Sequence, residues 1–190
     1  MTRKRKKILP LIAAALLVLI AVCAAVSYQT VQRSLYPLKE TALVEQYAQE
    51  YGVPAYLIYA VINTESGFDP DAVSDLGALG IMQMTPDTFD WLQTKTGDDL
   101  PDDALFDKEI SIRYGTLFLS MLLEEFGDEN TAIAAYHAGR GRVNEWLENT
   151  EYAPDGKILT NIPTKDTAHY VYKVSRAVEK YQELYDLQEV

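Results

Sequence analysis

Residues 63–83 read NTESGFDPDAVSDLGALGIMQ, and this stretch places a single glutamate, Glu65, where a helical pattern stops and a loop rich in aspartate and glycine begins. A carboxyl group in the last turn of a helix lies near the negative end of the helix dipole, which disfavours its ionisation. If the apolar preceding helix and the segment Gly80–Met82 also shield it from water, desolvation raises its pKa in the same way. Both effects favour the protonated carboxyl that a general acid needs near neutral pH. The alternative is a solvated charge at a helix end.

Helical periodicity continues on both sides of this stretch, from residue 38 nearly to the end of the chain. We expect Pro54 at a first helical position, Thr85 as a cap before Pro86, and Asn130 as the cap of a later helix. Alternating strand patterns are not convincing, apart from a short piece around residues 157–160, and there is no internal repeat. The sequence therefore predicts a mainly α fold, with helices over 38–51, 54–65, 85–96, 107–127, 130–139 and from about 164 onward, and a loop at 97–103.

Residues 8–26, ILPLIAAALLVLIAVCAAV, form an uncharged run about long enough to cross a ~30 Å hydrocarbon layer as a helix. The basic residues 3–7 precede it, so the positive-inside rule keeps the amino terminus in the cytoplasm and exports everything after about residue 27. We expect a basic cytoplasmic tip at 1–7, a single-pass transmembrane anchor at 8–26, a spacer at 27–38 and one main domain at 39–190. A cleaved signal peptide ending near Cys23 is the rival interpretation. A lipoprotein modified at Cys23 is disfavoured, because Val22 is a poor residue to precede it.

Composition restricts the class of the exported part. A chain of 190 residues with 48% hydrophobic residues suits one packed domain. The net charge is −11 and the basic tip contributes +5, so the remainder carries −16, which disfavours nucleic-acid binding. The single cysteine lies inside the apolar run, and the two histidines form no ligand cluster. We therefore expect no disulfide, no metal site and no cofactor.

Four short motifs follow one another in a recognisable order. They are Glu65–Pro70 (ESGFDP), residues 72–83 (AVSDLGALGIMQ), residues 134–139 (AAYHAG) and residues 162–171 (IPTKDTAHYV). Together they resemble the soluble (SLT) type of lytic transglycosylase, a family of bacterial enzymes that cut the glycan of peptidoglycan. The resemblance covers roughly residues 40–185, and its specificity lies in the order of the motifs.

The resemblance implies a lysozyme-like helical domain with a substrate cleft and Glu65 as the single acid/base. Glu65 would protonate the oxygen between N-acetylmuramic acid and N-acetylglucosamine, and would then take the proton of the sugar's 6-hydroxyl to leave a 1,6-anhydromuramic end. A muramidase of the goose-lysozyme type is the first alternative, and it needs a second carboxylate from the loop aspartates. The second alternative is an anchored scaffold that binds glycan without turnover.

The same resemblance assigns roles to further residues. Ser74 would hydrogen-bond the catalytic carboxyl or a substrate acetamide, and Gln83 would bind sugar groups. Met82 would pack beneath the cleft, while Tyr136 would place its hydroxyl near the scissile bond. Tyr170 matches the closing motif, although a tyrosine on an apolar helix face also suits a protein core.

Three positions depart from the family's pattern. Thr85 stands where some members carry a cleft-lining methionine, and His137 stands where asparagine is typical. Asp166 replaces the closing glutamate and is one methylene shorter. We expect Thr85 to change the shape of a subsite. We expect Asp166 either to weaken the orientation of Tyr136 or Gln83 or to be compensated by a backbone shift. His137 is either a partly exposed histidine at a helix end or a sugar-binding residue.

Overall fold

The structure is a computed structural model that describes residues 3–185 and 187, with side chains from residue 14 onward, in two compact units divided between Pro37 and Leu38. The first unit is one helix, α1 (Arg3–Leu35), which at about 1.5 Å per residue is about 50 Å long. Among the described residues, its segment Ala14–Leu35 is the one long and apolar enough to cross a membrane, and its apolar side chains are exposed. The expected spacer is therefore helical as far as Leu35.

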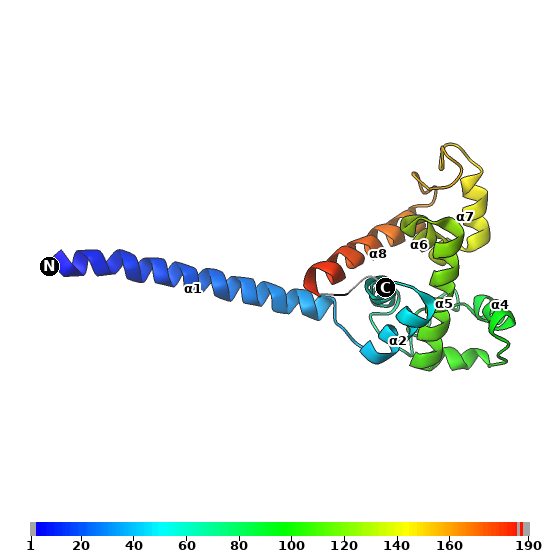
Figure 1. The fold of residues 1–190 in the computed structure, drawn as a ribbon, viewed down its shortest axis with the longest axis horizontal. Coiled ribbons are helices and arrows are strands. Elements are labelled where there is room, and N and C mark those ends of the chain that lie inside the picture. Colours follow the sequence, from blue (N-terminus) through cyan, green and yellow to red (C-terminus); the bar gives the residue numbers. More distant parts are fainter. Residues whose placement is uncertain (1–2, 186, 188–190) are drawn as a thin grey trace. The chain divides into compact units, whose positions relative to one another are not determined.

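The second unit is built from helices, so the predicted mainly α class is confirmed (Figure 1). Within the described residues, extended pairing is limited to isolated bridges at Val73–Leu79 and Leu79–Met84. The strand expected around residues 157–160 is absent, and that segment is a series of bends. The helices of the second unit are α2 (Thr41–Tyr51), α3 (Ala55–Glu65), α4 (Pro86–Thr96), η1 (Asp102–Phe106), α5 (Lys108–Phe126), α6 (Glu129–Ala138), α7 (Arg140–Leu147) and α8 (Lys165–Leu184).

Side-chain caps account for several helix starts. Thr85 Oγ1 accepts a hydrogen bond from the backbone N–H of Thr88, as expected of a cap before Pro86. Asp107 caps α5 through the N–H groups of Glu109 and Ile110.

Two predicted starts were wrong in position. α6 is capped by Asp128, whose Oδ1 accepts from the Thr131 N–H at 2.8 Å. Asn130 lies inside the first turn, where its side chain accepts from Ser175 instead. α3 begins at Ala55, so Pro54 occupies the cap position rather than the first helical one.

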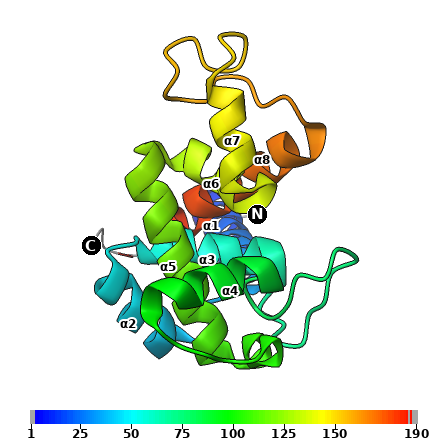
Figure 2. The ribbon, with the colours of Figure 1, turned by 90° about the vertical axis from the view of Figure 1, so that its right-hand side faces the viewer.

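α3 is the most enclosed helix of this unit. It packs against α2 and α8, while α5 packs against α2 and α6 (Figure 2). Leu57, Ile58, Val61 and Ile62 are fully buried, and each such side chain stabilises the fold by about 1.5–3 kcal/mol. This packing fixes the helix whose last residue is Glu65.

Candidate active site

The end of α3 is tied directly to the Gly80–Gln83 turn. Ser66, which follows Glu65, donates its hydroxyl to the Ile81 carbonyl at 2.7 Å. The Ser66 hydroxyl oxygen also accepts a hydrogen bond from the backbone N–H of Asp69. The loop between α3 and α4 projects from the helical unit beyond this point (Figure 2), but its base is anchored at the carboxyl end of α3.

The turn at 80–83 is closed by two backbone hydrogen bonds exchanged between Leu79 and Met84, at 2.9 and 3.0 Å. Gly80 has φ 73°, and a Cβ there would lie 1.9 Å from the Leu105 carbonyl oxygen, so only glycine fits this contact. Gln83 has φ 49°, an uncommon value for a residue other than glycine. Its side-chain Nε2 donates to the carbonyls of Ala72 and Gly80 at 3.0 and 2.9 Å. The loop residue expected to bind sugar therefore also holds the loop in shape.

Glu65 is half-buried, and its Oε1 accepts a 2.6 Å hydrogen bond from the Tyr170 hydroxyl. Burial raises the pKa of Glu65 from its ordinary value of 4.5 to about 7, against the Tyr170 hydrogen bond and the charge of Lys173, which both lower it. The carboxyl can therefore both give and take a proton near neutral pH.

Two tyrosines accompany this carboxyl. Tyr136 donates its hydroxyl to the Met82 carbonyl at 2.9 Å. Burial and the nearby Glu65 charge raise the pKa of Tyr136 and of Tyr170 well above the ordinary value. Both phenols therefore stay neutral and can act as hydrogen-bond donors.

The remaining residues singled out in the sequence lie around this centre. Ser74 uses its hydroxyl to accept from the Ala78 N–H at 2.9 Å, within its own loop. Met82 is fully buried and its sulfur packs on Gly115. Asp166 is exposed in the first turn of α8.

The loop aspartates belong to the turns rather than to the carboxyl centre. Asp69, Asp71 and Asp75 are all exposed. Asp69 Oδ1 accepts from the Asp71 N–H at 3.0 Å, a local turn that aspartate commonly forms.

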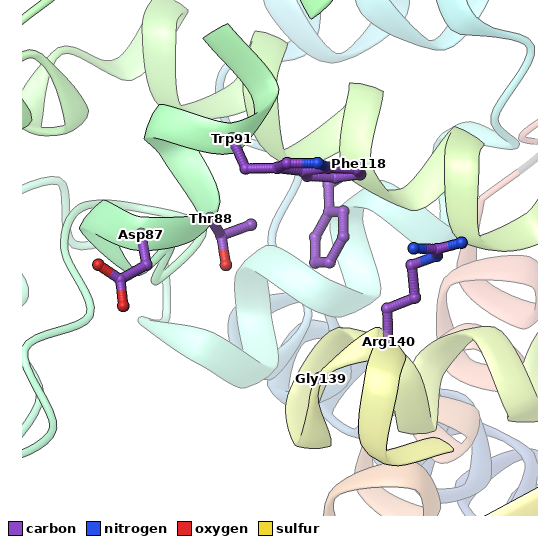
Figure 3. Close-up of a pocket in the computed structure, with 6 residues that line it drawn as sticks. All are labelled: Asp87, Thr88, Trp91, Phe118, Gly139 and Arg140. Carbon is purple, nitrogen blue, oxygen red and sulfur yellow. The ribbon is translucent and has the colours of Figure 1, made fainter. Parts of the chain in front are cut away.

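A groove leads away from the site along α4, α5 and α7. Two cavities of about 260 and 320 Å³ share Trp91, Phe118 and Arg140 in their walls. Figure 3 shows the residues that line the first of them. A third of about 40 Å³ shares Phe118 with them and is lined by Gln83 and Tyr136. The smallest cavity therefore reaches Gln83 and Tyr136, and the two larger ones are lined by residues further from Glu65.

Sequence reasoning missed the groove residues Trp91 and Arg140, and Lys173 beside the carboxyl. Trp91 and Phe118 lie with ring centroids 6.3 Å apart in an edge-to-face arrangement. Trp91 is half-exposed in the structure; in the sequence, the only available signal was a tryptophan on a short polar helix, a residue type enriched at binding surfaces. Arg140 opens α7, a helix that the sequence pattern did not indicate.

No metal site was expected from the sequence. Among the described residues, no three or more His, Cys, Asp or Glu side chains gather as metal ligands. The expectation stays a prediction.

The chain is similar to known proteins over most of this helical unit. The family model for the transglycosylase SLT domain matches residues 42–159. The chain is 35% identical, over 73% of its length and 44% of the relative's, to the membrane-bound lytic murein transglycosylase C of Actinobacillus pleuropneumoniae. It is 32% identical, over 73% of its length and 22% of the relative's, to the soluble lytic murein transglycosylase of Escherichia coli. The chain thus spans less than half the length of these curated relatives.

Solved structures agree in fold. An inactive glutamate-to-glutamine mutant of the lytic transglycosylase Slt from Pseudomonas aeruginosa superposes with a TM-score of 0.69 at 35% identity, over 81% of this chain and 26% of that one. The 70-kDa soluble lytic transglycosylase of Escherichia coli gives 0.71 at 28% identity, over 80% of this chain and 25% of that one. The expected lysozyme-like fold is thereby confirmed. The chain belongs to the transglycosylase SLT domain family.

Proposed function

We propose that this chain is a membrane-anchored lytic transglycosylase that cleaves the β-1,4 bond between N-acetylmuramic acid and N-acetylglucosamine in peptidoglycan. The observation that carries the proposal is the half-buried Glu65, with a pKa of about 7 and a hydrogen bond from Tyr170. Family membership supports it, as do the names of the relatives. The inactive glutamate-to-glutamine mutant of the Pseudomonas relative adds that one glutamate is essential in that protein.

In the proposed reaction one carboxyl serves both half-reactions. Protonated Glu65 gives its proton to the glycosidic oxygen as the bond to C1 breaks, and N-acetylglucosamine leaves as an alcohol. The muramic acetamido group assists from the substrate side. The Glu65 carboxylate then takes the proton of the 6-hydroxyl while that oxygen bonds to C1. Glu65 is protonated again at the end and no water is consumed.

The neighbouring groups suit this cycle. Tyr170 donates to the ionised form of Glu65 and so stabilises the carboxylate between the two steps. Tyr136 is held at the turn by its bond to the Met82 carbonyl, and it lines a small cavity together with Gln83. Ser74, Met82 and Asp166 are proposed to shape the subsite around them.

The muramidase alternative requires a second carboxylate to activate water. The loop aspartates are exposed, and Asp69 is engaged in a turn, which favours the transglycosylase reading. The scaffold alternative gives no reason for the environment of Glu65, because a half-buried carboxyl with a raised pKa is typical of a catalytic acid or base.

Anchoring rests on α1, whose exposed apolar surface suits a lipid environment. The basic residues 3–7 favour an amino terminus in the cytoplasm. We propose a single-pass protein whose helical unit works outside the membrane on peptidoglycan strands. No nucleic-acid partner and no cofactor form part of the proposal.

The test digests purified peptidoglycan with the full-length chain in detergent and weighs the products by mass spectrometry. We expect anhydro-muropeptides, each smaller than the hydrolysis product by one water. Glu65→Gln should reduce the rate by about 10²–10⁴-fold or more, since general acid–base help is typically worth that much. The matched controls Asp69→Asn, Asp71→Asn and Asp75→Asn should have far milder effects. Reducing-end muramic acids, lost on Asp75→Asn, would establish the muramidase instead.

A further inference from the structure

His137 is linked to Glu65 through one intervening ring. Its imidazole, in the last turn of α6, stacks on the phenol of Tyr170 with ring centroids 4.5 Å apart and planes 30° apart. Its Nδ1 lies 3.2 Å from the Thr167 hydroxyl. Thr167 and Tyr170 are buried and occupy one face of α8, three residues apart. The imidazole, phenol and carboxyl therefore form a continuous series contributed by α6, α8 and α3.

We propose that His137 is a positioning residue for the Glu65 acid/base, acting by holding the Tyr170 ring where its hydroxyl reaches Glu65. The inference rests on the proposed function of Glu65. A tyrosine hydroxyl donates well only while its ring keeps one orientation. Stacking on one side and the contact to Thr167, on the same helix face, fix the imidazole and with it the ring.

The consequence is a limit on the proton affinity of Glu65. The Tyr170 hydrogen bond lowers the pKa of Glu65 against the larger effect of burial. Loosening Tyr170 weakens that bond and lets the pKa rise further. His137 therefore helps to keep the carboxyl able to lose its proton in the first step.

Partial burial and nearby charges together set the protonation state of His137. Partial burial lowers the pKa of His137 from its ordinary value of 6.5, and the charge of Asp166 on α8 opposes this by raising it. On the other packed elements, Arg140 of α7 is paired with Glu125 of α5. Lys173 of α8 acts on Glu65. The lowered pKa of His137 favours the neutral imidazole on the alkaline side, where the Glu65 transition is followed.

The experiment measures initial rates of the full-length chain in detergent, at low peptidoglycan concentration, from pH 5 to 9. The rate falls on the alkaline side as Glu65 loses its proton. Tyr170→Phe should move the midpoint of this fall upward by about one to two pH units, since it removes a hydrogen bond to a charged group. His137→Ala should move it in the same direction by about half a unit, and His137→Phe, which keeps a ring for stacking, by less.

The double variant His137→Ala/Tyr170→Phe decides whether the effect passes through Tyr170. Its midpoint should match that of Tyr170→Phe alone, because the ring that His137 positions has lost its hydroxyl. His169→Ala, at the histidine of α8, is the matched control and should leave the midpoint in place, because within the described residues the structure shows no stacking of His169 on Tyr170. A ¹³C titration of the Glu65 carboxyl, with the signal assigned by its loss in Glu65→Gln, measures the pKa of Glu65 without turnover. It can therefore be used for any variant that is inactive.

Two results would overturn the inference: a His137→Ala midpoint equal to that of the unaltered chain, or shifts that add in the double variant. Product masses from the same digests keep this outcome separate from the proposed function. Anhydro products together with an unchanged midpoint for His137→Ala would disprove only the positioning role of His137. Hydrolytic products with the expected shifts remove the transglycosylase reaction and leave the positioning of Glu65 intact.

Discussion

At the scale of single residues, the sequence indicated Glu65 but not the contact that defines its chemistry. Its place at a helix end and the motifs around it were readable along the chain. The hydrogen bond to Tyr170 joins residues 105 positions apart. Such a contact depends on how α3 packs on α8, which no local pattern encodes.

Glu65 should lower the free energy of unfolding at alkaline pH. Its folded-state pKa of about 7 exceeds its ordinary value of 4.5, so the folded protein binds more protons between these values and stability falls as pH rises from 4.5 through 7. Glu65→Gln, which carries no charge, should therefore be more stable than the unaltered chain by about 1–3 kcal/mol at pH 8. The difference should vanish near pH 4.5.

Urea unfolding of the full-length chain in detergent at both pH values measures this difference. The exposed residue Glu124 supplies the control, and Glu124→Gln should leave stability nearly unchanged at pH 8. Equal stability of the Glu65→Gln variant and the unaltered chain at pH 8 would mean that the carboxyl is well solvated.

Gly80→Ala should be among the most disruptive small substitutions in the loop. The new Cβ would lie 1.9 Å from the Leu105 carbonyl oxygen, at a φ of 73° that alanine rarely adopts. Overpacking and backbone strain together should cost about 2–4 kcal/mol in unfolding free energy. Gly67→Ala, also at positive φ but with open space around it, should cost about 1 kcal/mol. Thermal or urea unfolding of the two variants compares strain with and without a clash.

At the scale of elements, helices with a clear cap and an apolar face were predicted to within a few residues. The helix predicted over 107–127 matches α5, because Asp107 caps it and Gly127 ends it in a left-handed conformation. α7 was missed, since its sequence RGRVNEWL is polar and only Val143 is buried. Packing on α6 stabilises α7, a tertiary contribution that periodicity does not report.

The helix caps at Asp107 and Thr164 should contribute unequally to the stability of the helical unit. Asp107 accepts hydrogen bonds from two backbone N–H groups of α5, whereas Thr164 precedes α8 without a side-chain cap bond. Asp107→Ala should destabilise the helical unit by about 0.5–2 kcal/mol. Thr164→Ala should change stability by less than half as much. A larger loss at Thr164 in urea unfolding would contradict this assignment.

At the scale of the whole molecule, the helical unit and the apolar helix were both evident from the sequence. The described structure extends the helix to Leu35, beyond the apolar run at 8–26. The groove along α4, α5 and α7 could not be predicted, because its walls come from three helices that meet only in the folded unit.

Membrane attachment should depend on α1. In fractionated cells the full-length chain should remain with the membranes after washing with high salt and leave them in detergent. External protease should reach the helical unit once the wall is removed. Replacing Leu16 and Leu19 with arginine should release a substantial fraction, because each buried charge costs about 2.5–3.5 kcal/mol at the centre of a membrane helix. A mature protein in the medium that begins near residue 25 would instead identify a cleaved signal peptide.

The pairing of α3 with α8 also sets an order of events during synthesis and export. Glu65 leaves the ribosome, and in the proposed topology crosses the membrane, about a hundred residues ahead of its hydrogen-bond partner Tyr170. Until α8 docks, the carboxyl lacks both the enclosure that raises its pKa and the phenol that moderates it. If the proposed function holds, we expect a partly exported chain to cut peptidoglycan poorly, because its Glu65 lacks these contacts. Under the proposed function, the acid/base centre would be complete only after the last helix has been exported and has docked.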